Sequence, residues 1–450
     1  MKFIGKKSLG LSVLLIHLNT HGAVINELTQ AVKLAQQNDP WLQKSQLHEV
    51  ANVHNSVAAQ QLPDPTISMG LMNLPTDGWQ FNQEPMTQLN VGISQRFERG
   101  DTLSLRAKQL AIQSEQEPIM REIRRRQVKT LISELWLEGF RAQQTIRLID
   151  KDKTLFEQMV DITEANYASV TGKTSQQDVI RAQLALTKLD DKRLVQQQIL
   201  EEILAQLQPW LTVQNSNDFG PQGAQYSVDF GNALPVIAID IENFIDIKSM
   251  KNNELYSALR NHPEIILQQK KQAVASQDVA IAKEQFKPQW GVSASYGYRD
   301  DDPSGNSRAD FFTVGVNVAM PIFSTTKQDK MLAATKAKQQ SIVTEKTIVL
   351  RELIGKTQKQ LNALHRLEQR YQLYRSQIIE QTVQQAEAAL TAYTHDNGSF
   401  SDVVSARISQ LDTKLSTLNI SVEALKTVAR LNYYLADSEH KQSIAGETNE

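Results

Sequence analysis

The stretch Asn261-His262-Pro263 repeats Asn38-Asp39-Pro40 at an offset of about 225 residues, and it belongs to a series of motifs that occurs twice. In both series a proline-led alternating strand, a strand ending in phenylalanine, and a glycine turn before Asp-Val follow in the same order. These motifs are Pro65, Phe97, Gly172 and Asp178-Val179 in the first series and Pro288, Phe323, Gly398 and Asp402-Val403 in the second. A repeat this long predicts two pseudo-symmetric halves, each with a helix, a β-hairpin and a long helical hairpin.

Four segments alternate apolar residues with small polar ones. Their apolar positions are Ile67, Met69 and Leu71, then Leu89, Val91 and Ile93, then Val292, Ala294, Tyr296 and Tyr298, and finally Val314, Val316, Val318 and Met320. Because side chains alternate between the two sides of a strand, we expect each strand to have one apolar and one polar face. Strands of roughly 10 residues with two such faces suit a membrane β-barrel with a water-filled lumen. Alternation alone fits two hairpins in a soluble sandwich equally well.

The segments after the hairpins predict unusually long helices. Residues 104–170 contain no glycine except Gly139 and no proline except Pro118. About 66 residues at 1.5 Å each would extend roughly 100 Å, with an interruption at Pro118. The matching stretch 327–393 has apolar residues at the three-four spacing that is typical of a coiled coil. Helices of this length cannot each bury a compact core, so we expect them to pack lengthwise on one another.

Four strands cannot cross a bilayer as an open sheet, because both edges would leave unpaired backbone groups in hydrocarbon. Closure therefore requires more than one copy of the chain. Two copies of four strands would give eight and three copies would give twelve, and both numbers fall within the known range of barrels. The attached helices would then form a matching tube, to which each chain contributes two similar units.

The N-terminus has the pattern of an export signal. Lys2, Lys6 and Lys7 precede the apolar run 9–18, and Gly22 or Ala23 offers a small residue for cleavage. The apolar run is shorter than the roughly 20 residues of a spanning helix, and no later stretch approaches that length. We therefore expect the mature chain outside the cytoplasm and any membrane insertion through β-strands.

The composition excludes several kinds of site. Among 450 residues, 48 Lys and Arg balance 50 Asp and Glu, so the chain lacks the basic excess of a nucleic-acid-binding protein. It contains no cysteine, which excludes disulfides, thiolate metal sites and thiol nucleophiles. Neither the helix motif of zinc proteases nor a phosphate-binding glycine loop occurs. We therefore expect no catalytic residue, no metal site and no cofactor.

Taken in order, these elements resemble the TolC family of outer-membrane efflux channels over nearly the whole mature chain. The supporting motifs are Leu62-Pro63-Asp64-Pro65, Gln95 to Phe97 with Gly100, Met320-Pro321-Ile322-Phe323, and the two glycine turns before Asp-Val. Within that family, Pro63-Asp64-Pro65 with Asn73-Leu74-Pro75 is most similar to the branch that serves heavy-metal cation efflux.

The resemblance implies a mainly α fold with a transmembrane β-hairpin pair. A homotrimer would build a twelve-stranded β-barrel in outer-membrane lipid and a long coiled-coil α-helical barrel across the periplasm. Such channels dock onto a periplasmic adaptor (a membrane fusion protein) bound to an inner-membrane pump, here of the resistance-nodulation-division type. The channel would export heavy-metal cations or drugs passively, and it would not be an enzyme.

The resemblance also implies roles for single residues. Tyr393 and Asp402 match the pore gate, with Ser405 standing where the family often has a second acidic residue. Tyr167 and Asp178 are the first-repeat equivalents. A ring of Asp402 carboxylates would attract cations, although this residue could instead cap the returning helix. Adaptor docking is implied for the two tips, which comprise Val170, Thr171, Gly172 and Lys173, and Asn397, Gly398 and Ser399. The alternative is that these residues only make the turns.

The expected organisation is a signal peptide (1–23), a first repeat (24–210, hairpin 62–97), a linker (211–248), a second repeat (249–437, hairpin 287–323) and a flexible tail (438–450). Two other classes remain open. A periplasmic coiled-coil adaptor or scaffold would explain the helices but would not require four alternating strands. A secreted enzyme acting on cell-wall material could use Asp300 and Asp301, but runs of loop charges are usually solvated.

Overall fold

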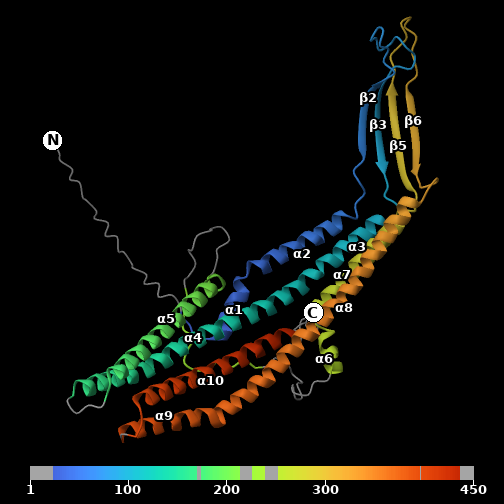
Figure 1. The fold of residues 1–450 in the computed structure, drawn as a ribbon. Coiled ribbons are helices and arrows are strands. Elements are labelled where there is room, and N and C mark those ends of the chain that lie inside the picture. Colours follow the sequence, from blue (N-terminus) through green and yellow to red (C-terminus); the bar gives the residue numbers. More distant parts are fainter. Residues whose placement is uncertain (1–23, 170–173, 213–225, 239–251, 396, 436–450) are drawn as a thin grey trace, which may run out of the picture.

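The structure, a computed structural model, describes residues 24–169, 174–212, 226–238, 252–395 and 397–435. The molecule is elongated, with a slender β-sheet at one end and long helices running from its base to the opposite end (Figure 1). The prediction of a mainly helical chain that carries a pair of β-hairpins is confirmed. The predicted signal peptide over 1–23 and tail over 438–450 lie outside the described residues.

The two halves contain similar elements in the same order. The first half has β1 (Val24–Ile25), α1 (Leu28–Asn38), α2 (Pro40–Ala58), β2 (Thr66–Met72), β3 (Gln88–Arg96), α3 (Thr102–Ser114), α4 (Gln116–Ala168) and α5 (Gln176–Leu211). The second half has β4 (Ser227–Val228), α6 (Asn252–Leu259), α7 (Pro263–Glu284), β5 (Gln289–Tyr298), β6 (Phe311–Ala319), α8 (Thr326–Leu373), α9 (Ile379–Thr394) and α10 (Phe400–Leu435). The π-helical segment η2 (Tyr374–Ile378) joins α8 to α9 in one rod.

The repeated motif that ends in proline starts a helix in each half for the same physical reason. Proline occupies the first helical position, where no backbone N–H is needed. The residue before it caps the helix. The Asp39 carboxylate accepts from the Trp41 N–H at 3.0 Å, and Nδ1 of His262 accepts from the Glu264 N–H at 3.3 Å. The two halves therefore use one motif with different capping side chains.

Both long rods have one local irregularity. In the first rod α3 ends at Ser114 and α4 begins at Gln116, so Pro118 stands in the first turn of α4, where a helix tolerates proline. The predicted interruption is therefore present, a few residues before the proline. The second rod, for which the apolar spacing over 327–393 predicted a coiled-coil helix, contains the π-helical segment η2, and just beyond it the Thr382 hydroxyl donates to the carbonyl oxygens of Ile378 and Ile379.

The helices farthest from the sheet pack side by side in the order α5, α4, α10 and α9 (Figure 1). Ile149 of α4, Leu189 of α5 and Leu411 of α10 share one buried cluster. Leu361 of α8 and Leu431 of α10 belong to another cluster, closer to the sheet. Each helix thus buries a stripe against its neighbours rather than contributing to one compact core, as its length requires.

A second layer covers one side of α4 and α10 near the middle of the rods. β1 pairs in parallel with β4, and Phe230 packs edge-to-face on Trp136 of α4 with ring centroids 5.0 Å apart. Gly139 makes room for this ring, since a Cβ there would lie 2.2 Å from the Phe230 Cζ. Ala31 of α1 belongs to the same core. Residues 213–225 and 239–248 of the predicted linker lie outside the described residues.

Candidate functional site

The four main strands form one antiparallel sheet in the order β2, β3, β5 and β6. From edge to edge, the register aligns Ile67, Ile93, Ala294 and Val314. One face of the sheet is therefore apolar across all four strands, and it is exposed, since Phe312 keeps 72% of its surface open. An apolar face of this size marks contact with lipid or with a protein partner.

The opposite face of the sheet carries small and polar residues. Its register aligns Ser68, Gly92, Ser295 and Thr313. Gly291 leaves room for a longer amide, because a Cβ there would lie 2.1 Å from the Asn317 Oδ1. The two-faced strands predicted from the alternation are therefore present, and the two faces have opposite solvent preferences.

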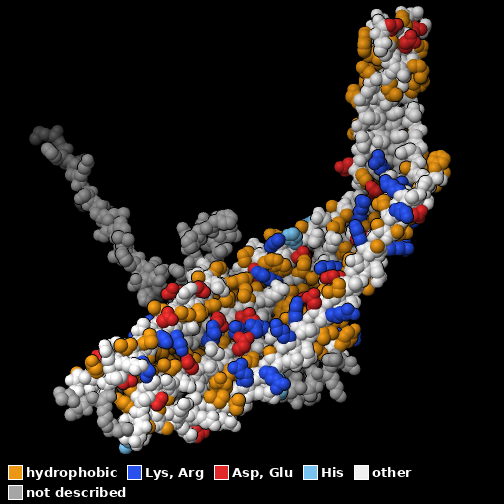
Figure 2. Space-filling model, in the orientation of Figure 1, with side chains coloured by type: hydrophobic (Ala, Val, Ile, Leu, Met, Phe, Trp, Pro, Cys, Tyr) orange, Lys and Arg blue, Asp and Glu red, His pale blue; other side chains and the backbone are white. Residues whose placement is uncertain are grey.

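The sheet has two open edges. Among the described residues, β2 and β6 each have one hydrogen-bonded neighbouring strand. Within the four strands the single charged residue is Arg96, the last residue of β3. Charges gather instead in the loops at the tip and at the base of the sheet (Figure 2). None of the described helices combines the length and the apolar character that a membrane-crossing helix needs.

Two arginines join the loops at the tip of the sheet. Nη1 of Arg299 donates to the Pro85 carbonyl at 2.9 Å, and its guanidinium lies 4.0 Å from the centroid of the Phe311 ring. Arg308 donates to the Asn82 carbonyl at 3.1 Å. The two hairpin tips of one chain therefore form a single unit. Sequence reasoning missed this contact, because the partners are more than two hundred residues apart.

At the opposite end, Tyr393 lies against the start of α10. Its ring packs edge-to-face on Phe400 with centroids 5.7 Å apart, at the margin of the buried cluster that contains Ile149. The Asn397 N–H donates to the Ala392 carbonyl at 2.9 Å. Tyr393 thus stabilises the turn between α9 and α10 within its own chain.

The two acidic residues implied by the gate resemblance have different surroundings. The Asp178 carboxylate accepts from the Ser175 N–H at 3.0 Å and from its hydroxyl at 2.7 Å, which closes a capping box at the start of α5. At the start of α10 the Ser399 hydroxyl accepts from the Asp402 N–H at 3.2 Å. Among the described residues, the exposed Asp402 carboxylate has no hydrogen-bond or ion-pair partner. Ser405, also exposed, shares its face of α10.

The other residues implied by the resemblance are distributed over the two tips. Tyr167 is 53% exposed near the end of α4. Asn397, Gly398 and Ser399 are exposed in the turn before α10. The remaining four tip residues, Val170, Thr171, Gly172 and Lys173, lie outside the described residues.

Ion pairs that the sequence did not predict connect the two helical hairpins. Nζ of Lys414 on α10 lies 2.9 Å from Oδ2 of Asp152 on α4. Nζ of Lys192 on α5 lies 2.8 Å from Oδ1 of Asp412 on α10. Both contacts join elements that come from different repeats, so electrostatic attraction adds to the buried stripe in holding the halves together.

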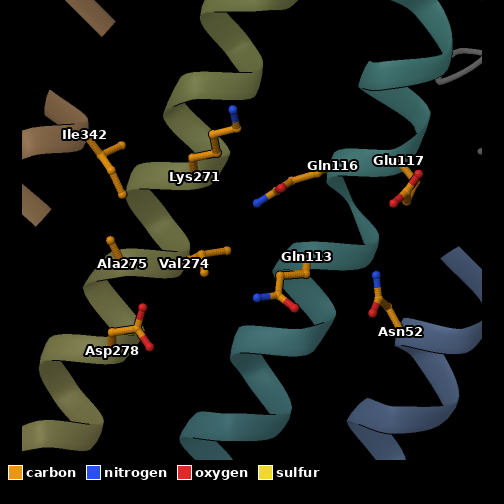
Figure 3. Close-up of a pocket in the computed structure, with 9 residues that line it drawn as sticks. All are labelled: Asn52, Gln113, Gln116, Glu117, Lys271, Val274, Ala275, Asp278 and Ile342. Carbon is orange, nitrogen blue, oxygen red and sulfur yellow. The ribbon is translucent and has the colours of Figure 1, made fainter. Parts of the chain in front are cut away.

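A cavity of about 360 Å³ lies where α2, α3, α4, α7 and α8 approach one another (Figure 3). Lys271 and Asp278 of α7 face Gln113 and Gln116 across it (Figure 3). Asp278 accepts from Gln109 at 2.5 Å. Its lining holds one cation (Lys271), two anions (Glu117 and Asp278) and several amides, so it carries at most one excess negative charge. In the part of the chain that the structure describes, no group of three His, Asp or Glu side chains could hold a metal ion.

A four-stranded sheet with one apolar and one polar face, continued by long coiled helices, defines the fold of an outer-membrane channel. VceC from Vibrio cholerae has a TM-score of 0.70 to this structure at 16% identity, with 91% of this chain and 96% of VceC covered. The CmeC channel from Campylobacter jejuni has a TM-score of 0.71 at 13% identity, covering 100% and 98%. CusC has a TM-score of 0.73 at 13% identity, covering 92% of each chain.

Residues 255–436 match the model of the family described as outer membrane efflux protein. No curated protein sequence matches the chain. Residues 255–436 thus resemble the outer membrane efflux proteins, and the predicted resemblance of the chain to the TolC family is confirmed.

Proposed function

We propose that three copies of this chain form a passive export duct from the periplasm to the outside. The observation that carries this proposal is the sheet, which has an exposed apolar face, a polar face and two open edges. In a bilayer the apolar face would meet lipid, and the open edges would have to pair with other copies. Because the four strands alternate in direction, β6 of one copy and β2 of the next would meet antiparallel, which continues the ladder.

The repeats would give the duct its wall. Residues 24–210 and 249–437 would each supply one hairpin of the barrel and one long helical hairpin of the periplasmic tube. Twelve strands from three copies would enclose a lumen lined by the polar face. The outer membrane is the location that fits this arrangement, with the helical part in the periplasm.

The partners follow from the resemblance to tripartite efflux channels. A periplasmic adaptor, a membrane fusion protein, would bind the helical tips at Asn397, Gly398 and Ser399 and at residues 170–173. An inner-membrane pump of the resistance-nodulation-division type would supply the energy. The cargo would be heavy-metal cations or drugs, so the duct itself needs no catalytic group or cofactor.

The gate would lie at the turn before α10. Tyr393 is held against Phe400, while Asp402 and Ser405 are exposed on one face of α10. Three Asp402 carboxylates brought together at the pore axis would attract cations and narrow the opening. Because the Asp178 carboxylate is occupied in a capping box, this first-repeat residue would stabilise a helix end rather than line the ring, and Tyr167 would make contacts beside it.

The absence of cysteine allows a clean test of barrel closure. Cysteine is introduced at Ser68 of β2 together with Thr313, Gly315 or Asn317 of β6, and outer membranes are oxidised and extracted with detergent. Within one chain two strands separate these positions, about 14 Å at 4.8 Å per strand, which is too far for a disulfide. Closure predicts covalent dimers and trimers for at least one pair, and none for Ser68→Cys alone.

The mass of the unmodified protein completes this test. A particle of three chains in the outer-membrane fraction supports the duct. Recovery as a soluble periplasmic monomer or dimer, without cross-links, would contradict it and would favour a coiled-coil adaptor or scaffold instead.

A further inference from the structure

We propose that a basic groove between α8 and α10 lines the lumen of the helical tube and attracts multivalent organic anions during their passage. This inference rests on the proposed duct and concerns the chemistry of its cargo. The groove has a volume of about 630 Å³. Its charged lining residues are Lys359, Arg366 and Arg370 of α8 and Glu423 and Arg430 of α10.

The charge of this groove is not balanced locally. Arg430 is paired with Glu134 of α4 and with Glu423, its Nη1 lying 3.0 Å from the Glu423 Oε1. The three α8 cations are exposed, and no carboxylate of the described residues forms an ion pair with them. Arg366 donates to the neutral amide of Gln369 at 2.7 Å. The groove therefore carries an excess of positive charge from α8.

The three cations form one stripe along α8. Lys359 and Arg366 are seven residues apart and Arg370 follows four residues later, so they share one face of the helix. Two of the three are arginines, whose planar guanidinium groups can bind a carboxylate, sulfonate or phosphate through two parallel hydrogen bonds. A stripe of this kind suits an anion with more than one charged group.

The positions of residues on α8 and on α10 both indicate the side of the helices on which the groove lies. On α10, Arg430 lines the groove, and Asn432, whose side-chain amide donates to the Ala238 carbonyl at 2.8 Å, stands two residues further. Two residues correspond to about 200° around a helix. On α8, Arg366 lines the groove while Leu364, two residues earlier, packs in the cluster with Leu255 of α6. The groove therefore lies opposite the covering layer that includes α6 and Ala238.

In a closed tube the covering layer belongs outside, because a second layer of helices and strands on the inner side would fill the duct. The face opposite this layer is then the inner wall. The groove lies far from the proposed acidic ring, since Glu423 and Asp402 are 21 residues apart on α10, or about 30 Å. At physiological ionic strength that separation is several times the Debye length of about 8 Å, so the two charged zones act independently.

The test measures ion selectivity of the purified protein in planar bilayers under a KCl gradient. The double variant R366Q/R370Q removes two groove cations. The control K33Q/R260Q removes two exposed cations from the covering layer, where Lys33 lies two residues from both buried Ala31 and Ala35. The groove variant should shift the reversal potential toward that of potassium. A change of about one kT per unit charge in local potential would lower the local chloride concentration and raise that of potassium roughly threefold each, and so would lower the chloride-to-potassium permeability ratio roughly sevenfold. The control should leave the ratio unchanged.

Block by the trisulfonate dye pyranine gives a second readout. The wild-type current should be blocked at lower dye concentration than the current of R366Q/R370Q. If R366Q/R370Q forms conducting pores with the permeability ratio and the dye block of the wild type, the anion groove is overturned while the duct stays intact. An equal shift in the control would also overturn it. If neither the wild-type protein nor the hairpin-loosening variants Asp152→Asn and Lys414→Gln form pores, the duct and the groove both fail.

Discussion

The side chain of Lys414 on α10 binds that of Asp152 on α4, with Nζ 2.9 Å from Oδ2 and 3.1 Å from Oδ1. This ion pair joins the second helical hairpin to the first. Asp152 is the more enclosed partner, with 16% of its side chain exposed against 35% for Lys414. The pair therefore lies where a rotation of one hairpin against the other would separate its charges.

We predict that Asp152→Asn and Lys414→Gln each weaken the contact between the hairpins. The coupling should amount to about 1 kcal/mol, since both groups retain some contact with water. In a channel gated by these hairpins, each single variant would open more often. The charge exchange D152K/K414D should recover much of the lost coupling between the hairpins. Single-channel open probability and melting temperature both measure this recovery. Equal behaviour of the exchange and the single variants would contradict a direct pair.

The two faces of the sheet give a second prediction. Val314→Lys places a charge on the apolar face and should cost about 2–4 kcal/mol near the middle of a membrane, which prevents stable insertion. Thr313→Lys, one residue earlier, places the same charge on the polar face. The Thr313→Lys variant should therefore be inserted into the membrane normally. The amount of trimer extracted from outer membranes distinguishes the variants, and equal losses would argue against a lipid-facing sheet.

The helix starts of the two hairpins give a third prediction. Asp178→Ala removes the two hydrogen bonds that the Asp178 carboxylate accepts from the Ser175 N–H and hydroxyl, the first of which is one half of the capping box at α5, and it should cost roughly 1 kcal/mol of stability. Asp402→Ala removes a carboxylate without a described partner. It should leave the melting temperature almost unchanged but lower the preference of the pore for cations. If Asp402→Ala instead destabilises the protein as much as Asp178→Ala, its role is structural.

The capping side chain His262 makes stability sensitive to acid. Burial lowers the pKa of His262 despite its bond to the Tyr433 carbonyl; Glu264, Arg126 and Glu122 are the charged groups around it. Its Nδ1 must stay unprotonated to accept from the Glu264 N–H. The folded state disfavours the charged ring, so neutral His262 contributes to the stability of the fold. This contribution is complete above the ordinary histidine pKa of about 6.5 and is lost as the pH falls below that value toward the lowered pKa of the folded state.

We therefore predict that the melting temperature of the wild-type protein falls between pH 7 and pH 5. The loss from this group should be at most about 1.4 kcal/mol per pH unit. His262→Asn keeps a capping acceptor and cannot titrate, so its melting temperature should depend less on pH. A pH dependence as steep as that of the wild type would assign the acid sensitivity to other groups.

The sequence predicted the fold where a local pattern determines the structure. The alternation over Val314–Val318 predicted strand β6 and its two faces, and Pro40 and Pro263 marked the starts of helices α2 and α7. It did not predict η2, because nothing in the composition of residues 374–378 separates a π turn from an α turn. Nor did it predict the pair of Lys414 with Asp152, since 262 residues separate them and their meeting depends on the packing of α10 beside α4. The gate and docking assignments stay predictions.

The open edges of the sheet bear on how the protein reaches its final state. A single exported copy would present β2 and β6 unpaired beside an apolar face, which is a template for unwanted strand pairing. Removing one copy from a closed ring of three would expose an edge on each of the two copies left behind. A partial ring would therefore gain little from its remaining contact, and assembly and breakdown should both be all-or-none.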